Sequence, residues 1–333
     1  MENKLMLNVP KILGALAAGL LCSTLAIPQA HAQAQPWPTK PVRVVVPFTA
    51  GSATDILART VGQKLAELWG QQVVVENRTG AGGTIGAAMV AKSPPDGYTL
   101  MVHSSAQAVN AFIYPSLPYD TLKDFAQVSP LGGQPNVLVV SAASGYKTVA
   151  DLLADVRRKP GALNFASAGI GSGTHFNAEK FKLAAGIDVV HVPYKGTPEA
   201  LTDTMAGRTA YYFSPISASL PLLRDGRLVA LGVSSPRRAA ALPAVPTIAE
   251  SGLAGFEYNL WVGMFAPAGT PAEVVDKINR DVNRVLQEPD VKERMAALGT
   301  EAMPMTTAEF DRFMRSEMED AARVVKASGM KVQ

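Results

Sequence analysis

The chain has 333 residues, of which 47% are hydrophobic, and 31 Lys and Arg residues against 28 Asp and Glu residues give a formal net charge of +3. Because the basic residues are scattered among acidic ones, the sequence lacks the basic stripe of a nucleic-acid-binding protein. A chain of this length can bury a large core and suggests two domains.

The N-terminal 32 residues have the pattern of a secretory signal peptide. Lys4 and Lys11 make a basic start, residues 12–27 form an apolar run, and Ala30-His31-Ala32 is a small-x-small cleavage site. The apolar run is shorter than the roughly 20 residues that span a membrane, which disfavours the alternative of a retained anchor helix. We expect a cleaved signal peptide at 1–32 and a periplasmic protein.

Cys22 is the only cysteine and precedes the cleavage site, so we expect no disulfide bond in the mature chain. A lipoprotein is a second alternative, but Cys22 follows Leu21, whereas a lipid-modified cysteine needs a small residue before it. A secreted chain without disulfide bonds depends on its hydrophobic core. No second long apolar run follows, and the mature protein should be soluble.

Strand-like and helix-like segments alternate after the signal peptide. The β-branched run 42–48 is typical of a strand covered on both faces. Apolar residues at helical spacing then predict a helix that ends at Gly70. Further strands are predicted at 71–78 and 97–103, with a helix at 82–93 between them. This order predicts a parallel sheet.

A second alternating set begins near Thr148. Thr148 and Asp151 predict a capping box for a helix that ends at Gly161, and Thr197 with Pro198 predicts the start of a later helix. Strands are predicted at 163–167, 188–194, 209–214 and 227–235, and another helix at 174–186.

The last part of the chain begins with a strand-like segment at 256–271. Thr270-Pro271 with Glu273 predicts a capping box for a helix to Gln287, and Thr306 with Glu309 predicts another before the last helix. The similar rhythm of the two halves predicts two α/β lobes.

Two loops share a pattern of strand, small residues, glycine and helix: VVVPFTAGSATDIL at 44–57 and NFASAGIGSGTHF at 164–176. The first turn of a helix has unpaired N–H groups and partial positive charge, and glycine lets a ligand approach the backbone, so such a turn binds anions. A tight turn with a Ser or Thr cap is the alternative. Facing each other, the loops would hold an anion from both sides in a protein that closes on its ligand.

The glycine-rich segments match no catalytic or nucleotide-binding motif. GIGSGT at 169–174 lacks the Gly-Lys-Ser/Thr of a phosphate-binding loop, the third glycine of a dinucleotide fingerprint and the glycines that flank a hydrolase serine. GAGGTIG at 80–86 is interpreted as the start of a helix. His103 and His191 lack the spacing of metal ligands. We expect no enzyme, no metal and no cofactor.

Six segments carry a resemblance to a known family. They are WPTKPVRVVVPFTAGSATDILAR, VVVENRTGAGGTIGAAMVAKSPPDGYTL, YPSLPYDTLKDF, HVPYKGTPEAL, LPAVPTIAESGLAGFE and WVGMFAPAGTP. Over nearly all of residues 36–333 the sequence resembles the Bug receptors, also called TctC-like extracytoplasmic solute receptors. Ligands in that family are usually dicarboxylates, tricarboxylates, acidic amino acids or aromatic carboxylates.

The resemblance implies an α/β fold of the type II periplasmic binding protein (Venus flytrap) kind, with a five-stranded mixed sheet in each lobe. The chain would cross between the lobes twice, near 140–143 and near 258–261. Lobe 1 would then contain residues 33–142 and 260–333, and lobe 2 residues 143–259.

By the same resemblance, a ligand carboxylate would lie between the loops at 48–55 and 167–175, partly through ordered water. The candidate ligand-binding residues are Phe48, Ala50, Gly51, Ser52, Thr54, Asp55, Ser104, Ser105, Ser167, Ala168, Gly171, Ser172, Thr174, His175, Tyr194, Lys195 and Ser214. Several keep a structural alternative: Asp55 could order the first loop, Ser104 and Ser105 could cap a helix, and Phe48 and His175 could be core residues.

The sequence departs from the family pattern at two positions. The first loop often reads AGGxxD in the family, but here Ser52 replaces a glycine. Many members have an Asp where this chain has Ser214, and without that carboxylate a cationic amine loses a partner. The departure at Ser214 favours a simple or aromatic carboxylate over an amino acid.

The resemblance implies a monomeric periplasmic receptor that delivers a small organic acid to a tripartite tricarboxylate transporter in the membrane. A ligand sensor for a membrane two-component kinase is the alternative with the same fold and site. An exported hydrolase is disfavoured, because no recognised motif brings Ser, His and a carboxylate together.

Overall fold

The structure, a computed structural model, describes residues 37–330. The predicted signal peptide at 1–32 lies outside this range. The first elements are β1 (Val42–Val46), α1 (Ala53–Trp69), β2 (Val73–Asn77), the 3₁₀ helix η1 (Ala81–Gly83), α2 (Thr84–Ala91), β3 (Thr99–Ser104), α3 (Ala106–Ile113) and β4 (Phe125–Ser141).

The middle of the chain forms a second series of elements. They are the 3₁₀ helix η2 (Ala142–Ser144), α4 (Val149–Arg158), β5 (Asn164–Ser167), α5 (Gly173–Ala185), β6 (Val190–Pro193), α6 (Thr197–Met205), β7 (Tyr211–Pro215), α7 (Ile216–Arg224) and β8 (Leu228–Val233). The chain then forms β9 (Asn259–Pro267), α8 (Ala272–Val285), α9 (Pro289–Ala297), β10 (Glu301–Ala302) and α10 (Thr307–Ser328).

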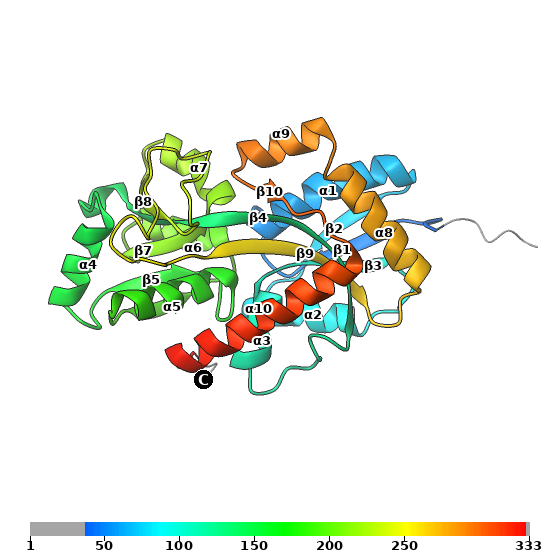
Figure 1. The fold of residues 1–333 in the computed structure, drawn as a ribbon, viewed down its shortest axis with the longest axis horizontal. Coiled ribbons are helices and arrows are strands. Elements are labelled where there is room, and N and C mark those ends of the chain that lie inside the picture. Colours follow the sequence, from blue (N-terminus) through cyan, green and yellow to red (C-terminus); the bar gives the residue numbers. More distant parts are fainter. Residues whose placement is uncertain (1–36, 331–333) are drawn as a thin grey trace, which may run out of the picture. The chain divides into compact units, whose positions relative to one another are not determined.

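The strands form a mixed sheet in the order β2-β1-β3-β9-β4-β7-β5-β6, with β8 and β10 paired to β4. β1 is parallel to β2 and β3, and β5 is parallel to β6 and β7, as the alternating elements predict. The long strand β4 joins the two groups, because it pairs with β9 over residues 125–135 and with β7 and β8 over 136–141 (Figure 1). The α/β fold with mixed sheets is therefore confirmed.

Helices cover both groups of strands through apolar faces. Leu57, Val61 and Leu65 of α1 are buried in one core cluster with residues of β1, β3 and β9. A second cluster contains aromatic residues, among them Phe181 of α5, whose ring meets Phe213 edge to face at 5.1 Å. Full burial of one such side chain contributes roughly 1.5–3 kcal/mol, so these faces fix each helix on its strands.

Two of the predicted capping boxes are confirmed, at Thr148 with Asp151 and at Thr306 with Glu309. The box predicted at Thr270 and Glu273 is wrong. Pro271 is the N-cap of α8 and makes no side-chain cap, because the Thr270 hydroxyl donates to the carbonyl oxygen of residue 267 instead.

Two helix ends also differ from the prediction. The N-cap of α6 is Gly196 rather than Thr197, which is already helical. The helix expected to end at Gly161 ends at Arg158, where Lys159 leaves helical geometry.

Candidate functional site

The first predicted loop joins β1 to α1 and is held by Asp55. Ser52 is the N-cap of α1, and its hydroxyl accepts a hydrogen bond from the Asp55 N–H at 3.3 Å. The Asp55 carboxylate accepts bonds from the Gly51 N–H at 2.9 Å and from the side chains of Arg59 at 3.0 Å and Asn77 at 2.9 Å. Burial raises the pKa of Asp55, but the bonds from Arg59, Gly51 and Asn77 outweigh it and hold the pKa below its ordinary value.

The second predicted loop joins β5 to α5, and its polar atoms also bond to one another. Ser172 is the N-cap of α5 and accepts from the His175 N–H at 3.2 Å. The Thr174 hydroxyl accepts from the Ala168 N–H at 2.9 Å and lies 3.0 Å from the Ser172 hydroxyl. In both loops the buried hydroxyl and carboxylate groups therefore stabilise the loop itself.

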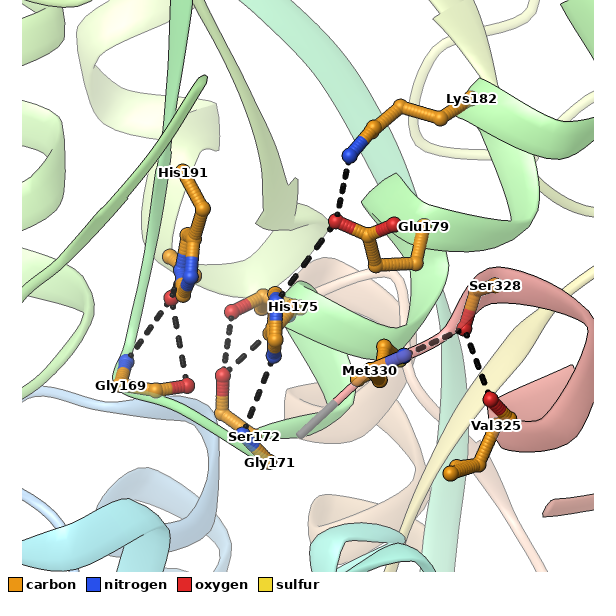
Figure 2. Close-up of polar contacts among 12 residues, drawn as sticks. Gly169, Gly171, Ser172, His175, Glu179, Lys182, His191, Val325, Ser328 and Met330 are labelled. Atoms are coloured by element: carbon orange, nitrogen blue, oxygen red, sulfur yellow. Dashed lines mark hydrogen bonds and ion pairs between the residues drawn. The ribbon is translucent and has the colours of Figure 1, made fainter. Parts of the chain in front are cut away.

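Two stacked histidines lie beneath the second loop. The rings of His175 and His191 are 3.8 Å apart and almost parallel, and the Gly171 N–H donates to Nδ1 of His175 at 3.1 Å (Figure 2). Burial lowers the pKa of His191 to about 4, and burial, His191 and Lys182 together lower the pKa of His175 well below 6.5. Both rings are therefore neutral at neutral pH and support the loop without adding positive charge.

No Ser and His in this region have the arrangement of a catalytic pair with substrate access. The Ser167 hydroxyl is 2.6 Å from Nε2 of His191, but Ser167 is fully buried. Nδ1 of His175 already accepts from the Gly171 N–H, and Ser172 bonds to the backbone of α5. A nucleophile must reach its substrate, which neither serine can do as placed.

A cavity of about 270 Å³ lies between the two loops. Its wall combines one residue of the first loop, the turn before α2, the residue after α3, part of the second loop and the end of β6. The lining residues are Phe48, Gly80, Ala81, Gly82, Gly83, Tyr114, Ala168, Gly169, Ile170, Pro193, Tyr194 and Lys195. Lys195 is the one charged side chain of this wall within residues 37–330.

Four predicted site residues meet in this cavity, namely Phe48, Ala168, Tyr194 and Lys195. The other loop residues lie outside its wall. They are Ala50, Gly51, Ser52, Thr54 and Asp55 in the first loop and Ser167, Gly171, Ser172, Thr174 and His175 in the second. Ligand contact by these ten residues stays a prediction.

The three predicted serines at strand ends also lie outside this cavity. The Ser104 hydroxyl accepts from the Ala106 N–H at 3.3 Å, as a helix-start residue does. Ser105 bonds to the Tyr258 hydroxyl at 2.7 Å. Ser214 is fully buried in β7 and donates to a carbonyl oxygen at 3.1 Å.

The turn at residues 80–83 lines the cavity, although the sequence predicts it only as the start of a helix. Gly82 has φ +61°, and a Cβ there would clash with the carbonyl oxygen of Ile170 in the second loop. Tyr114, which is likewise absent from the predicted site residues, donates a hydrogen bond from its hydroxyl to the same oxygen at 3.2 Å. The glycines after β2, at the carboxyl end of a parallel strand, were the signal that could have identified this wall.

A larger cavity of about 790 Å³ lies beside β9 and α10 and contains Ser105 but no other predicted site residue. Its wall includes Trp261, whose Nε1–H donates to the Glu317 carboxylate at 2.6 Å. Burial raises the pKa of Glu317. This wall has mixed charge, with Lys180, Arg237 and Arg238 beside four acidic residues, whereas Lys195 is, among the described residues, the one charged side chain that lines the smaller cavity. The smaller cavity, which presents no carboxylate among its described lining residues, is therefore the better candidate for an anion.

The chain matches known solute receptors over most of its length. The family model described as "Tripartite tricarboxylate transporter family receptor" matches residues 57–330. Protein BugT of Bordetella pertussis is 35% identical over 329 residues, which is 98% of this chain and 100% of that protein. Receptors of this family are extracytoplasmic solute-binding proteins, not enzymes.

Solved structures support the same assignment. Rpa4515 of R. palustris, solved with adipate, has a TM-score of 0.86 at 36% identity over 88% of this chain and 98% of that one. MatC (Rpa3494) of Rhodopseudomonas palustris, solved with malate, has a TM-score of 0.81 at 33% identity over 86% and 99%. Between Trp37 and Met330, no helix is long and apolar enough to cross a membrane. The fold is that of a periplasmic binding protein, and the chain belongs to the TctC family of tripartite tricarboxylate transporter receptors.

Proposed function

We propose that this protein is a periplasmic receptor that binds a small organic carboxylate in the cavity between the two loops and delivers it to a tripartite membrane transporter. The observation that carries the proposal is a cavity whose described wall contains Phe48 of the first loop, residues 168–170 of the second loop and a lone cation, Lys195. Two relatives of the same family were solved with carboxylates, adipate and malate.

Two lobes that move relative to each other would explain how the ligand enters. Residues 33–142 with 260–333 would form one lobe and 143–259 the other, and β4 and β9 would carry the two crossings. A ligand that contacts both loops would bind the closed arrangement better than the open one and shift the population toward it. The closed surface would then be presented to the transporter.

Thermal unfolding of the mature protein with a panel of acids and their neutral amides tests the binding. A ligand at 100 times its dissociation constant adds about 2.7 kcal/mol to the free energy of unfolding, so a true ligand gives a clear rise in melting temperature. We expect acids to stabilise the protein and amides not to. Equal effects of acid and amide would contradict carboxylate recognition.

A variant that fills the smaller cavity tests whether the ligand binds there. Ala168 is buried in the cavity wall, whereas Ala272 is exposed at the start of α8. Ala168→Leu should abolish the ligand-induced rise in melting temperature, and Ala272→Leu, the matched control, should keep it.

Uptake of the bound acid by cells that lack only this receptor tests delivery to the transporter. We expect uptake to be lost, and unchanged uptake would argue against a transport role.

A further inference from the structure

The wall of the 270 Å³ cavity offers mainly hydrocarbon and ring surface. The Phe48 side chain is buried, and its ring packs edge to face on His103 at 5.5 Å. Ile170 and Pro193 supply aliphatic surface, and four of the lining residues are glycine or alanine of the turn before α2. The volume equals that of about nine liquid water molecules, which suits a small organic ligand.

The two tyrosines of the wall have hydroxyl groups that already donate to protein acceptors. The Tyr114 hydroxyl donates to the carbonyl oxygen of Ile170 at 3.2 Å, and the Tyr194 hydroxyl donates to the Asp203 carboxylate at 2.7 Å. Burial raises the pKa of each tyrosine to about 12, so neither ionises in the working range. Toward a ligand, both residues therefore offer chiefly ring surface.

The described groups of the cavity wall that can bind an anion are one cation and several free backbone amides. Lys195 is exposed and makes no ion pair with the residues that the structure describes. Within the same described range, the backbone N–H groups of residues 80–82, Ile170 and Lys195 in this wall have no hydrogen-bond acceptor. One carboxylate can be balanced by this set, because an ammonium group and two amides satisfy its oxygens. A second carboxylate would meet backbone amides but no second positive charge, because Lys195 is the one charged side chain that the structure describes in this wall, and a buried charge without a counter-charge is costly.

We propose that the site selects an acid with a single carboxylate and an apolar aliphatic or aromatic body, and that Lys195 is the specificity-determining counter-charge. This inference rests on the proposed function and narrows its ligand class. It sets this receptor apart from the relatives solved with adipate and malate, which are both dicarboxylates.

Isothermal titration with matched acids tests the inference on the mature protein. Hexanoate and adipate share a six-carbon chain, and benzoate and terephthalate share a ring; in each pair only the second acid carries an extra carboxylate. We expect the monoacid of at least one pair to bind about tenfold tighter or more than its diacid, since a hydrogen bond to a charged group contributes enough for that ratio. Lys195→Met should weaken the monoacid about tenfold, and Lys326→Met, an exposed control on α10, should leave it unchanged.

A gain-of-charge variant gives a second, independent readout. Ile170→Lys places another cation in the wall and should shift the preference toward the diacid, with folding checked by circular dichroism. Diacids that bind the unaltered protein as tightly as monoacids would overturn the inference and leave the proposed function standing. Unchanged preference in Ile170→Lys would also overturn it, whereas no binding of any acid would overturn the proposed function as well.

Discussion

Replacing Gly82 by alanine tests whether the close approach of the turn before α2 to the second loop builds the candidate cavity. Gly82 has φ +61° and lies against the carbonyl oxygen of Ile170. Gly70, at the end of α1, has almost the same conformation, φ +62°, but nothing lies within 4 Å of the position that a Cβ would take. Gly70→Ala is therefore a matched control that adds the backbone strain without the clash.

The two variants should differ in their free energy of unfolding by the energy of the contact between the turn at Gly82 and the second loop. A left-handed conformation costs an alanine about 1 kcal/mol, so both variants lose that much stability. In Gly82→Ala the Cβ must also push the second loop away, which breaks the bond between the Tyr114 hydroxyl and the Ile170 oxygen. That loss adds about 1 kcal/mol, for a total of about 2 kcal/mol. Ligand affinity should fall about tenfold in Gly82→Ala alone, because the cavity wall is displaced.

Urea unfolding and titration with the best acid measure both effects. We expect Gly70→Ala to bind ligand like the unaltered protein and to unfold at slightly lower urea. The reasoning is refuted if Gly82→Ala matches Gly70→Ala in stability and binds the acid with unchanged affinity, because the turn before α2 and the second loop would then not need to touch.

The remaining predictions concern stability. Burial lowers the pKa of His191 from 6.5 to about 4, so the unfolded chain binds more protons in that range and the free energy of unfolding should fall as the pH drops from about 6.5 to 4. His191→Gln should make this fall measurably shallower in urea titrations at each pH, and an unchanged slope would contradict the assignment. Asp55→Asn should cost about 2–3 kcal/mol at pH 7 by loss of charge-assisted bonds inside the loop, whereas Asp311→Asn, which breaks an exposed pair on α10, should cost less than about 1 kcal/mol; equal costs in chemical denaturation would refute the buried role of Asp55. Phe181→Ala should cost about 3–5 kcal/mol in the same assay, and a cost below about 1 kcal/mol would show that the second core is not packed as described.

Local sequence signals gave the fold because they act over a few residues. The β-branched run at 42–48 becomes β1, and the helix that follows ends at Gly70 in the left-handed conformation that glycine allows. The capping boxes at Thr148 and Thr306 form as expected. At Thr270 the same signal failed, because a nearby carbonyl oxygen competed for the hydroxyl.

The candidate site was only partly predictable, because its wall depends on contacts between distant segments. Both loops form helix starts after strands, as their glycines predict, but most of their hydroxyls, such as those of Ser52 and Ser172, bond within the loop. The turn at Gly82 lines the cavity only because it contacts Ile170, which lies 88 positions later in the chain. No local pattern reports such a contact.

A crystal structure of the mature protein with its tightest-binding acid tests the central claim most directly. We expect the carboxylate within hydrogen-bond distance of Nζ of Lys195 and the body of the ligand against Phe48 and Ile170, in the smaller cavity. Ligand density in the larger cavity instead, beside Trp261 and Glu317, would contradict the account.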